Sequence, residues 1–173
     1  MKTAYIGLGS NLGNSLQVLL EAWETLGKQP GIHLETLSSP YRTEPVGMVS
    51  QHWFINAAGS LETILQPEDL LEALLHVENL FGRTRNSGKS EYQDRILDCD
   101  LLLYDNIILE HNDLVVPHPE LQHRLFVLYP LSEIAPEYMH PVLRRTVRDL
   151  FAELVKVPNQ PGVEKVLWPD FGR

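Results

Sequence analysis

The chain has 173 residues, of which 43% are hydrophobic and 21% are charged, as in one ordinary globular domain. Its 23 acidic residues outnumber the 14 lysines and arginines, and this surplus excludes a nonspecific nucleic-acid binder, which needs a basic surface. The one cysteine, Cys99, cannot form an intrachain disulfide and lacks neighbouring ligands at the spacing of a zinc site. No apolar run approaches the roughly 20 residues that cross a bilayer, and the first residues enter a strand without a signal-peptide core. We therefore expect a cytoplasmic protein.

The first half of the chain predicts a strand, a helix and two further strands. An apolar strand over 3–8 leads into a glycine-rich turn, and an amphipathic helix then ends near Gly27. The turn lacks the acidic strand end of a dinucleotide-binding loop and the lysine of a phosphate-binding loop, so we interpret it as a strand-to-helix connection. Strands are predicted over 32–37 and 54–65, and the segment 41–47 is predicted to be a loop between them.

The second half begins with a helix over 66–82, which has proline near its first position and acids in its first turn. The polar segment 83–95 has no apolar periodicity and is expected to be a mobile loop. An apolar strand over 96–104 follows it. The elements expected beyond this strand are short strands over 107–109 and 114–116, helices over 120–134 and from Thr146, and a strand over 163–167.

This order predicts an α+β fold with a ferredoxin-like βαββαβ core. In such a fold a mostly antiparallel sheet has helices packed on one face and leaves the other face available for a site. We expect one domain over 1–173, with its core in about 3–136 and a C-terminal helical extension in about 137–173. The fold hosts many functions, so function must come from particular residues.

Two carboxylates interrupt the apolar strand that follows the polar loop. Asp98 and Asp100 are two positions apart, so they project from the same face of an extended strand, about 6 to 7 Å apart at the root. Such a pair needs a neutralising cation, and Mg²⁺ is usually held by one or two carboxylates together with substrate phosphates. Arg83, Arg85 and Arg95 lie just upstream and indicate phosphate chemistry. The spacing alone is also consistent with a strand end at which both aspartates are exposed to solvent and bind no metal.

Six motifs occur in an order that is similar to that of the 6-hydroxymethyl-7,8-dihydropterin pyrophosphokinase family, over about residues 3–136. The motifs are Gly9-Ser10-Asn11-Leu12-Gly13, Tyr41-Arg42-Thr43-Glu44-Pro45-Val46-Gly47, Asn56-Ala57-Ala58, Arg95-Ile96-Leu97-Asp98-Cys99-Asp100, Val116-Pro117-His118-Pro119 and Arg124-Leu125-Phe126. The resemblance implies an ATP-dependent diphosphokinase of folate biosynthesis. It would transfer pyrophosphate from ATP to the hydroxymethyl group of 6-hydroxymethyl-7,8-dihydropterin and release AMP. The implied cofactor is Mg²⁺, with two ions expected, and the implied partners are the two substrates, with no nucleic acid or membrane. A monomer or weak homodimer is expected.

The resemblance also implies roles for individual residues. Asp98 and Asp100 would hold the metal ions, and Arg83 and Arg95 would reach the triphosphate from the ends of the loop, so these four would be the catalytic set. The other residues expected to contact ATP are Glu78, His118 and Arg124. The residues expected to bind the pterin are Thr43, Val46, Phe54, Asn56 and Phe126, the two phenylalanines stacking on the ring and Asn56 pairing with its polar edge.

Other interpretations stay open on the sequence. Taken singly, Phe54 and Phe126 are more often typical of a core than of a binding site. Glu78 is equally typical of a helix surface, and the alternative for His118 is a turn histidine between two prolines. The chain departs from the family pattern at Gln93-Asp94, where a glycine is common, at Cys99 and at Pro119. Two alternative functions are a metal-dependent Asp-x-Asp phosphohydrolase, with Asp98 as nucleophile and Asp100 as general acid, and a non-catalytic ferredoxin-like ligand-binding module.

Overall fold

The computed structural model describes residues 1–47, 50–82, 94–111 and 113–169. The loop predicted over 83–95 therefore falls, except for its last two residues, outside the described part of the chain. The elements in chain order are β1 (Lys2–Ser10), α1 (Ser15–Gly27), β2 (Ile32–Leu37), β3 (Tyr41–Thr43), β4 (Phe54–Thr63), α2 (Pro67–Leu80), β5 (Asp98–Tyr104), β6 (Leu109–His111), β7 (Leu114–Val116), the 3-10 helix η1 (Leu121–His123), α3 (Leu125–Ile134), α4 (Val147–Leu154) and β8 (Val163–Lys165).

A six-stranded antiparallel sheet organises the molecule, in the order β5-β1-β4-β3-β8 with β2 also paired to β4. β2 pairs with the second half of β4 and β3 with its first three residues, so both share one edge of that strand. The elements β1, α1, β2, β4, α2 and β5 follow the predicted βαββαβ order. The ferredoxin-like prediction is confirmed.

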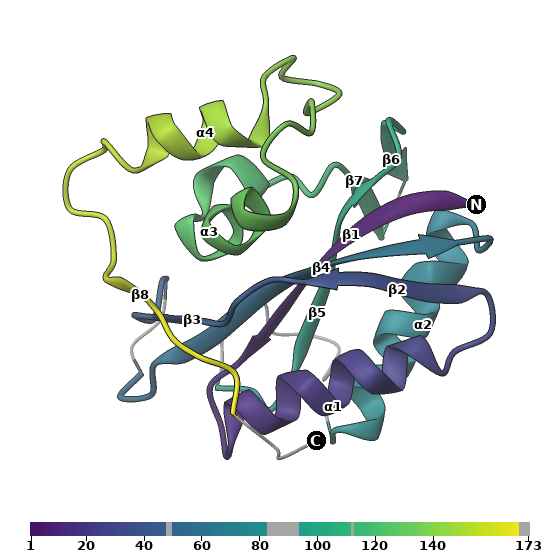
Figure 1. Cartoon of the computed structure of the whole chain (residues 1–173), viewed down its shortest axis with the longest axis horizontal. Helices are drawn as coiled ribbons and strands as arrows, with labels where there is room; N and C mark the ends of the chain where they lie inside the picture. The colour runs from purple at the N-terminus through teal and green to yellow at the C-terminus, as the bar shows by residue number, and fades with distance from the viewer. Residues whose placement is uncertain (48–49, 83–93, 112, 170–173) are drawn as a thin grey trace.

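Helices cover both faces of the sheet (Figure 1). α1 and α2 bury Leu19, Trp23 and Leu74 in one core cluster with β1, β4 and β5. α3 and α4 bury a second cluster on the opposite face, which includes Leu128 and Leu150. The expectation that all helices would lie on one face is therefore wrong. α3 covers part of the second face, because the side of α3 that contacts the sheet is apolar and needs a partner, and α4 packs on α3.

Local sequence explains the elements that position the site. Asn14 caps α1 by accepting a hydrogen bond from the amide of Gln17. Gly59 in β4 allows the ring of Trp23 to pack directly on the sheet, because a Cβ at that position would overlap the ring. Thr146 and Asp149 form a capping box at the start of α4.

Several boundaries differ from the predictions. Among the strands, β4 ends at Thr63 instead of 65, β5 begins at Asp98 instead of 96, and β8 ends at Lys165 instead of 167. The segment 41–43 forms strand β3 instead of a loop, and β6 starts at Leu109, where the predicted strand ended. The helix predicted over 120–134 is divided into η1 and α3 at Arg124, whose backbone is extended. No helix within the described ranges is long and apolar enough to cross a membrane.

Candidate active site

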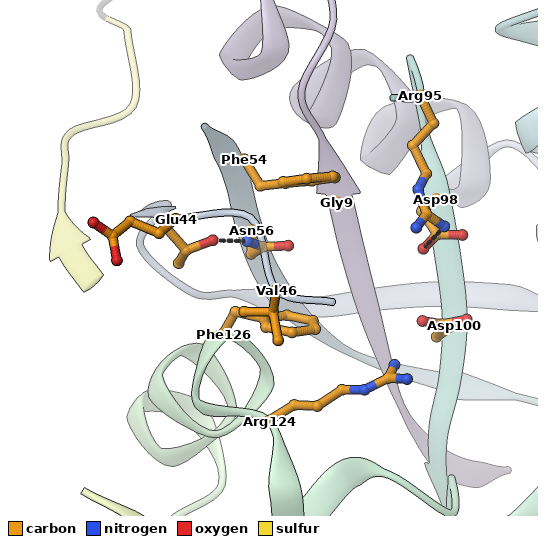
Figure 2. Close-up of a pocket in the computed structure, with 11 residues that line it drawn as sticks. Gly9, Glu44, Val46, Phe54, Asn56, Arg95, Asp98, Asp100, Arg124 and Phe126 are labelled. Carbon is orange, nitrogen blue, oxygen red and sulfur yellow. Dashed lines mark hydrogen bonds and ion pairs between the residues drawn. The ribbon is translucent and has the colours of Figure 1, made fainter. Parts of the chain in front are cut away.

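One pocket gathers residues from the sheet, the segment after β3, and α3 (Figure 2). Nine of the twelve predicted site residues line it: Thr43, Val46, Phe54, Asn56, Arg95, Asp98, Asp100, Arg124 and Phe126. Gly9 and Glu44 complete the lining, and sequence reasoning did not assign them to the site. Both lie inside the motifs that carried the family resemblance, which is the signal that could have found them.

The pocket has an apolar half formed by two phenylalanines from different elements. Phe54 is the first residue of β4 and Phe126 lies in the first turn of α3, and their rings face each other across the pocket (Figure 2). Val46 is added from the segment after β3 and is 42% exposed. This arrangement forms a slot that suits a flat heterocycle, since aromatic rings favour offset stacking on such a ligand.

Asn56 provides the polar groups of that slot. It is buried in β4, and its Nδ2 donates to Thr43 Oγ1 at 2.7 Å. This bond fixes the orientation of the amide. The Gly9 position lies directly beside it, because a Cβ built there would come within 3.0 Å of Asn56 Oδ1. A glycine at position 9 therefore keeps the side-chain oxygen of Asn56 accessible from the pocket.

The other half of the pocket is charged. Asp98 and Asp100 project from β5 beside β1, where their Cα partners are Gly9 and Gly7. Arg95 Nη1 donates to Asp98 Oδ2 at 2.7 Å. The guanidinium of Arg124 points toward Asp100, and it also lies 5.7 Å from the centre of the Phe126 ring (Figure 2). Arg124 thus stands between the apolar and the charged halves.

Asp100 is the electrostatically strained member of the pair. Burial and, after it, the charge of Asp98 raise the pKa of its carboxyl from 3.8 to about 7, while Arg124 partly opposes this rise. A carboxyl whose pKa is near 7 loses its proton at neutral pH with little change in free energy, so a cation can replace that proton. The pair therefore suits a cation that binds and leaves together with a substrate.

Glu78 lies behind the aspartate strand and not in the pocket. The residue is 1% exposed, and its Oε1 accepts a hydrogen bond from the amide of Cys99 at 2.8 Å. Cys99 is also buried, in the cluster beneath α1 and α2, as its position between the two aspartates predicts. Glu78 was expected to contact ATP, but the structure places it where it supports the backbone between Asp98 and Asp100.

His118 likewise does not line the pocket. It follows β7, and its Nδ1 accepts a hydrogen bond from the amide of Glu120 at 3.1 Å. Burial and then the charge of Arg124 lower the pKa of its imidazole, so the ring is neutral at neutral pH. Arg83, the twelfth predicted residue, lies outside the described residues.

A hydrogen-bonded junction at the edge of the site was not predicted. Asn11 Nδ2 and Ser50 Oγ both donate to Asp94 Oδ1, at 2.7 and 2.6 Å. The backbone of Asn11 donates to the carbonyl of Arg95, and the amide of Arg95 donates to Asn11 Oδ1. The side-chain bonds from Ser50 and Asn11 lower the pKa of Asp94. The unusual aspartate at position 94 therefore helps to hold the backbone from which Arg95 reaches Asp98.

Comparison with known proteins agrees with this geometry. The family model of 7,8-dihydro-6-hydroxymethylpterin-pyrophosphokinase matches residues 5–136. The chain belongs to this family. It is therefore an ATP-dependent pyrophosphokinase, and the phosphohydrolase and non-catalytic alternatives are not favoured.

Curated relatives match most of the chain. The 2-amino-4-hydroxy-6-hydroxymethyldihydropteridine pyrophosphokinase of Methylorubrum extorquens is 40% identical over 166 residues, which cover 96% of this chain and 99% of the relative. The protein of the same name from Haemophilus influenzae is 40% identical over 141 residues, covering 82% of this chain and 86% of the relative.

Solved structures support the fold. A structure of HPPK-DHPS in complex with substrates has a TM-score of 0.70 at 15% identity, over 90% of this chain and 44% of the other. Wild-type Plasmodium falciparum HPPK-DHPS with SDX-DHP has a TM-score of 0.70 at 17% identity, over 89% of this chain and 44% of the other. The pyrophosphokinase chain thus spans less than half of these longer proteins.

Proposed function

We propose that the pocket binds 6-hydroxymethyl-7,8-dihydropterin in its apolar half and the ATP triphosphate in its charged half, so that pyrophosphate passes from ATP to the pterin. The observation that supports this most directly is the continuity of the two halves. Phe54 and Phe126 bound an aromatic slot, and Asp98, Asp100 and Arg95 line the same pocket beside it. A hydroxymethyl group on a ring held in the slot would then meet the phosphates.

The chain's contribution to pterin binding is stacking and pairing. Phe54 and Phe126 would stack on opposite faces of the ring, each worth about 0.5 to 1.5 kcal/mol beyond the buried area. Asn56, held by Thr43, would present its carbonyl oxygen to ring N–H groups. These contacts fix the direction in which the hydroxymethyl oxygen points, and orientation of this kind is a large part of catalysis of group transfer.

The arginines would bind the triphosphate. Arg95 is bound to Asp98 in this structure, so it must exchange that carboxylate for a phosphate when ATP is present. Arg124 would hold a phosphate near the slot, since its guanidinium lies beside both Phe126 and Asp100. The hydroxymethyl oxygen of the pterin would then attack the β-phosphorus and release its proton to solvent. The bond between the β-phosphorus and the oxygen that bridges it to the α-phosphate would break, and AMP would leave with that oxygen.

The carboxylate pair fits Mg²⁺. Both donors are oxygen atoms on one face of β5, as this ion prefers. Within the described residues no third histidine, cysteine or acid joins them in a cluster, so phosphate oxygens and water would complete the coordination. When bound, Mg²⁺ offsets the charge of the triphosphate and makes its phosphorus more electrophilic. Two ions are expected.

The expected location and assembly also belong to this proposal. ATP as co-substrate supports a cytoplasmic location, and both substrates are small molecules that one copy of the pocket could accommodate. We propose a single domain, since β8 from the C-terminal extension is part of the same sheet. A monomer or weak homodimer is expected, and sedimentation velocity would distinguish the two.

The decisive assay combines the protein with ATP, Mg²⁺ and 6-hydroxymethyl-7,8-dihydropterin, and follows AMP and pterin diphosphate by chromatography. AMP should form only when the pterin is present. Asp98→Ala should lower turnover by at least about a hundredfold, because a metal ligand is lost. Asp113→Ala, which removes an exposed carboxylate between β6 and β7, serves as the matched control and should keep normal turnover. Near-normal turnover of Asp98→Ala at ordinary Mg²⁺ would contradict the metal assignment, and pterin-independent phosphate release would favour a phosphohydrolase.

A further inference from the structure

The C-terminal segment continues the sheet beside the pocket, although the family match ends at residue 136. β8 pairs antiparallel with β3, with Tyr41 opposite Lys165 and Thr43 opposite Val163. Contacts extend beyond the strand, because the amide of Val166 donates to the carbonyl of Pro40 at 2.9 Å. The indole of Trp168 donates to the carbonyl of Ser38, also at 2.9 Å. Residues 162–168 therefore lie along the outer edge of the strand that supplies Thr43.

This segment is also tied to the helix that carries Phe126. Glu133 in α3 accepts hydrogen bonds from Ser39 and from the hydroxyl of Tyr41 at 2.8 Å. Lys165 Nζ of β8 lies 3.2 Å from the same carboxylate. The two walls of the aromatic slot, one on β3 and β4 and one on α3, are thus linked at their outer side through Glu133.

The contact nearest the pocket joins Glu44 to Gly162. The amide of Glu44 donates to the carbonyl of Gly162 at 3.1 Å, and the amide of Gly162 donates back to Glu44 Oε2 at 2.8 Å. Glu44 lines the pocket, yet its carboxylate points away from the two phenylalanines and toward β8 (Figure 2). A side chain held in this direction leaves the slot open and fixes the backbone between Thr43 and Val46.

We infer that Glu44 and Gly162 form a clasp through which the C-terminal segment positions the pterin-binding wall. In this assignment Glu44 is a positioning residue. The clasp orders the backbone that carries Thr43 and Val46 before the pterin arrives, so binding costs less ordering entropy. The inference rests on the proposed function, since it assigns the slot to the pterin. It goes further by giving the segment beyond residue 136 a part in substrate affinity.

Steady-state kinetics of clasp variants test this assignment. Glu44→Ala should raise the KM for the pterin about three- to tenfold, the scale of one partly exposed hydrogen bond, with little change in kcat or in the KM for ATP. Glu44→Gln keeps an acceptor for the Gly162 amide and should restore most of the affinity. Glu164→Ala removes the same charge from an exposed position on β8 and should behave like wild type.

Gly162→Pro separates positioning from direct substrate contact, because it removes the donor N–H outside the pocket. It should raise the pterin KM as Glu44→Ala does. The pterin KM of the double variant should be no higher than that of the single variant with the higher KM, because both substitutions remove the same hydrogen bond. An unchanged KM in Gly162→Pro, additive effects in the double variant, or failure of Glu44→Gln to restore affinity would overturn the clasp.

Hydrogen exchange keeps this test independent of the proposed function. In the ligand-free protein, the amides of Glu44 and Gly162 should exchange faster in Glu44→Ala than in Glu164→Ala. Equal exchange in the two variants would refute the clasp even in an active enzyme. Wild-type protein that makes no pterin-dependent AMP would instead refute the proposed function, and the exchange result would still decide whether the clasp exists.

Discussion

Replacing Asp100 with asparagine should make the metal-free protein more stable and the enzyme inactive. The reason lies in the cost of a charged carboxylate at this position. Burial and the neighbouring Asp98 raise the pKa of Asp100 from 3.8 to about 7 in the folded state. Asparagine has nearly the same shape and carries no charge, so it removes that cost while it also removes a proposed metal ligand.

The magnitude follows from proton linkage. A rise of about three pKa units, at about 1.4 kcal/mol each, amounts to about 4 kcal/mol as an upper value. Between about pH 4 and pH 7 the folded state binds more protons at this site than the unfolded state, so its contribution to stability falls as pH rises. The free energy of unfolding of Asp100→Asn should therefore exceed that of wild type by about 2 to 4 kcal/mol at pH 8 and by less than about 1 kcal/mol at pH 4.

Urea unfolding in EDTA at the two pH values measures this difference. Asp113→Asn changes an exposed carboxylate and should show no such dependence on pH. Adding Mg²⁺ with an ATP analogue should then stabilise wild type but not Asp100→Asn. If Asp100→Asn were no more stable than wild type at pH 8, or if the difference in stability were the same at pH 4 as at pH 8, the electrostatic account of Asp98 and Asp100 would be wrong.

Three further changes test other parts of the structure. Arg95→Ala should lower kcat at least about tenfold and leave pterin affinity within about twofold, and equal losses in both would indicate a binding role. Phe126→Ala should weaken pterin binding about tenfold by calorimetry while ATP-analogue binding stays constant, because one stacking face is lost. An unchanged pterin affinity would show that Phe126 does not stack on the pterin. Gly59→Ala should destabilise the fold by about 1 to 3 kcal/mol in urea, because the new Cβ would overlap the Trp23 ring, and wild-type stability would contradict the close packing of α1.

Elements with strong apolar periodicity were predictable from the sequence. α1 and α2 have clear stripes and recognisable ends, and β2 and β7 lie where alternation or a short apolar run placed them. β3 was missed because it has only three residues, and its hydrogen-bond partners in β4 and β8 are separated from it in the chain. The break at Arg124 was missed because the sequence between Glu120 and Ile134 does not mark the single residue whose backbone is extended.

The sequence by itself determined the family, the fold class and most of the pocket, because ordered motifs record which residue types this chemistry requires. Only the tertiary structure decided how those side chains are used. It buries Glu78 behind β5, directs Glu44 toward Gly162, and packs α3 on the second face of the sheet with α4 against α3. The raised pKa of Asp100 is also a tertiary property. Burial and charge proximity depend on residues that are distant in the chain, and no local pattern contains that information.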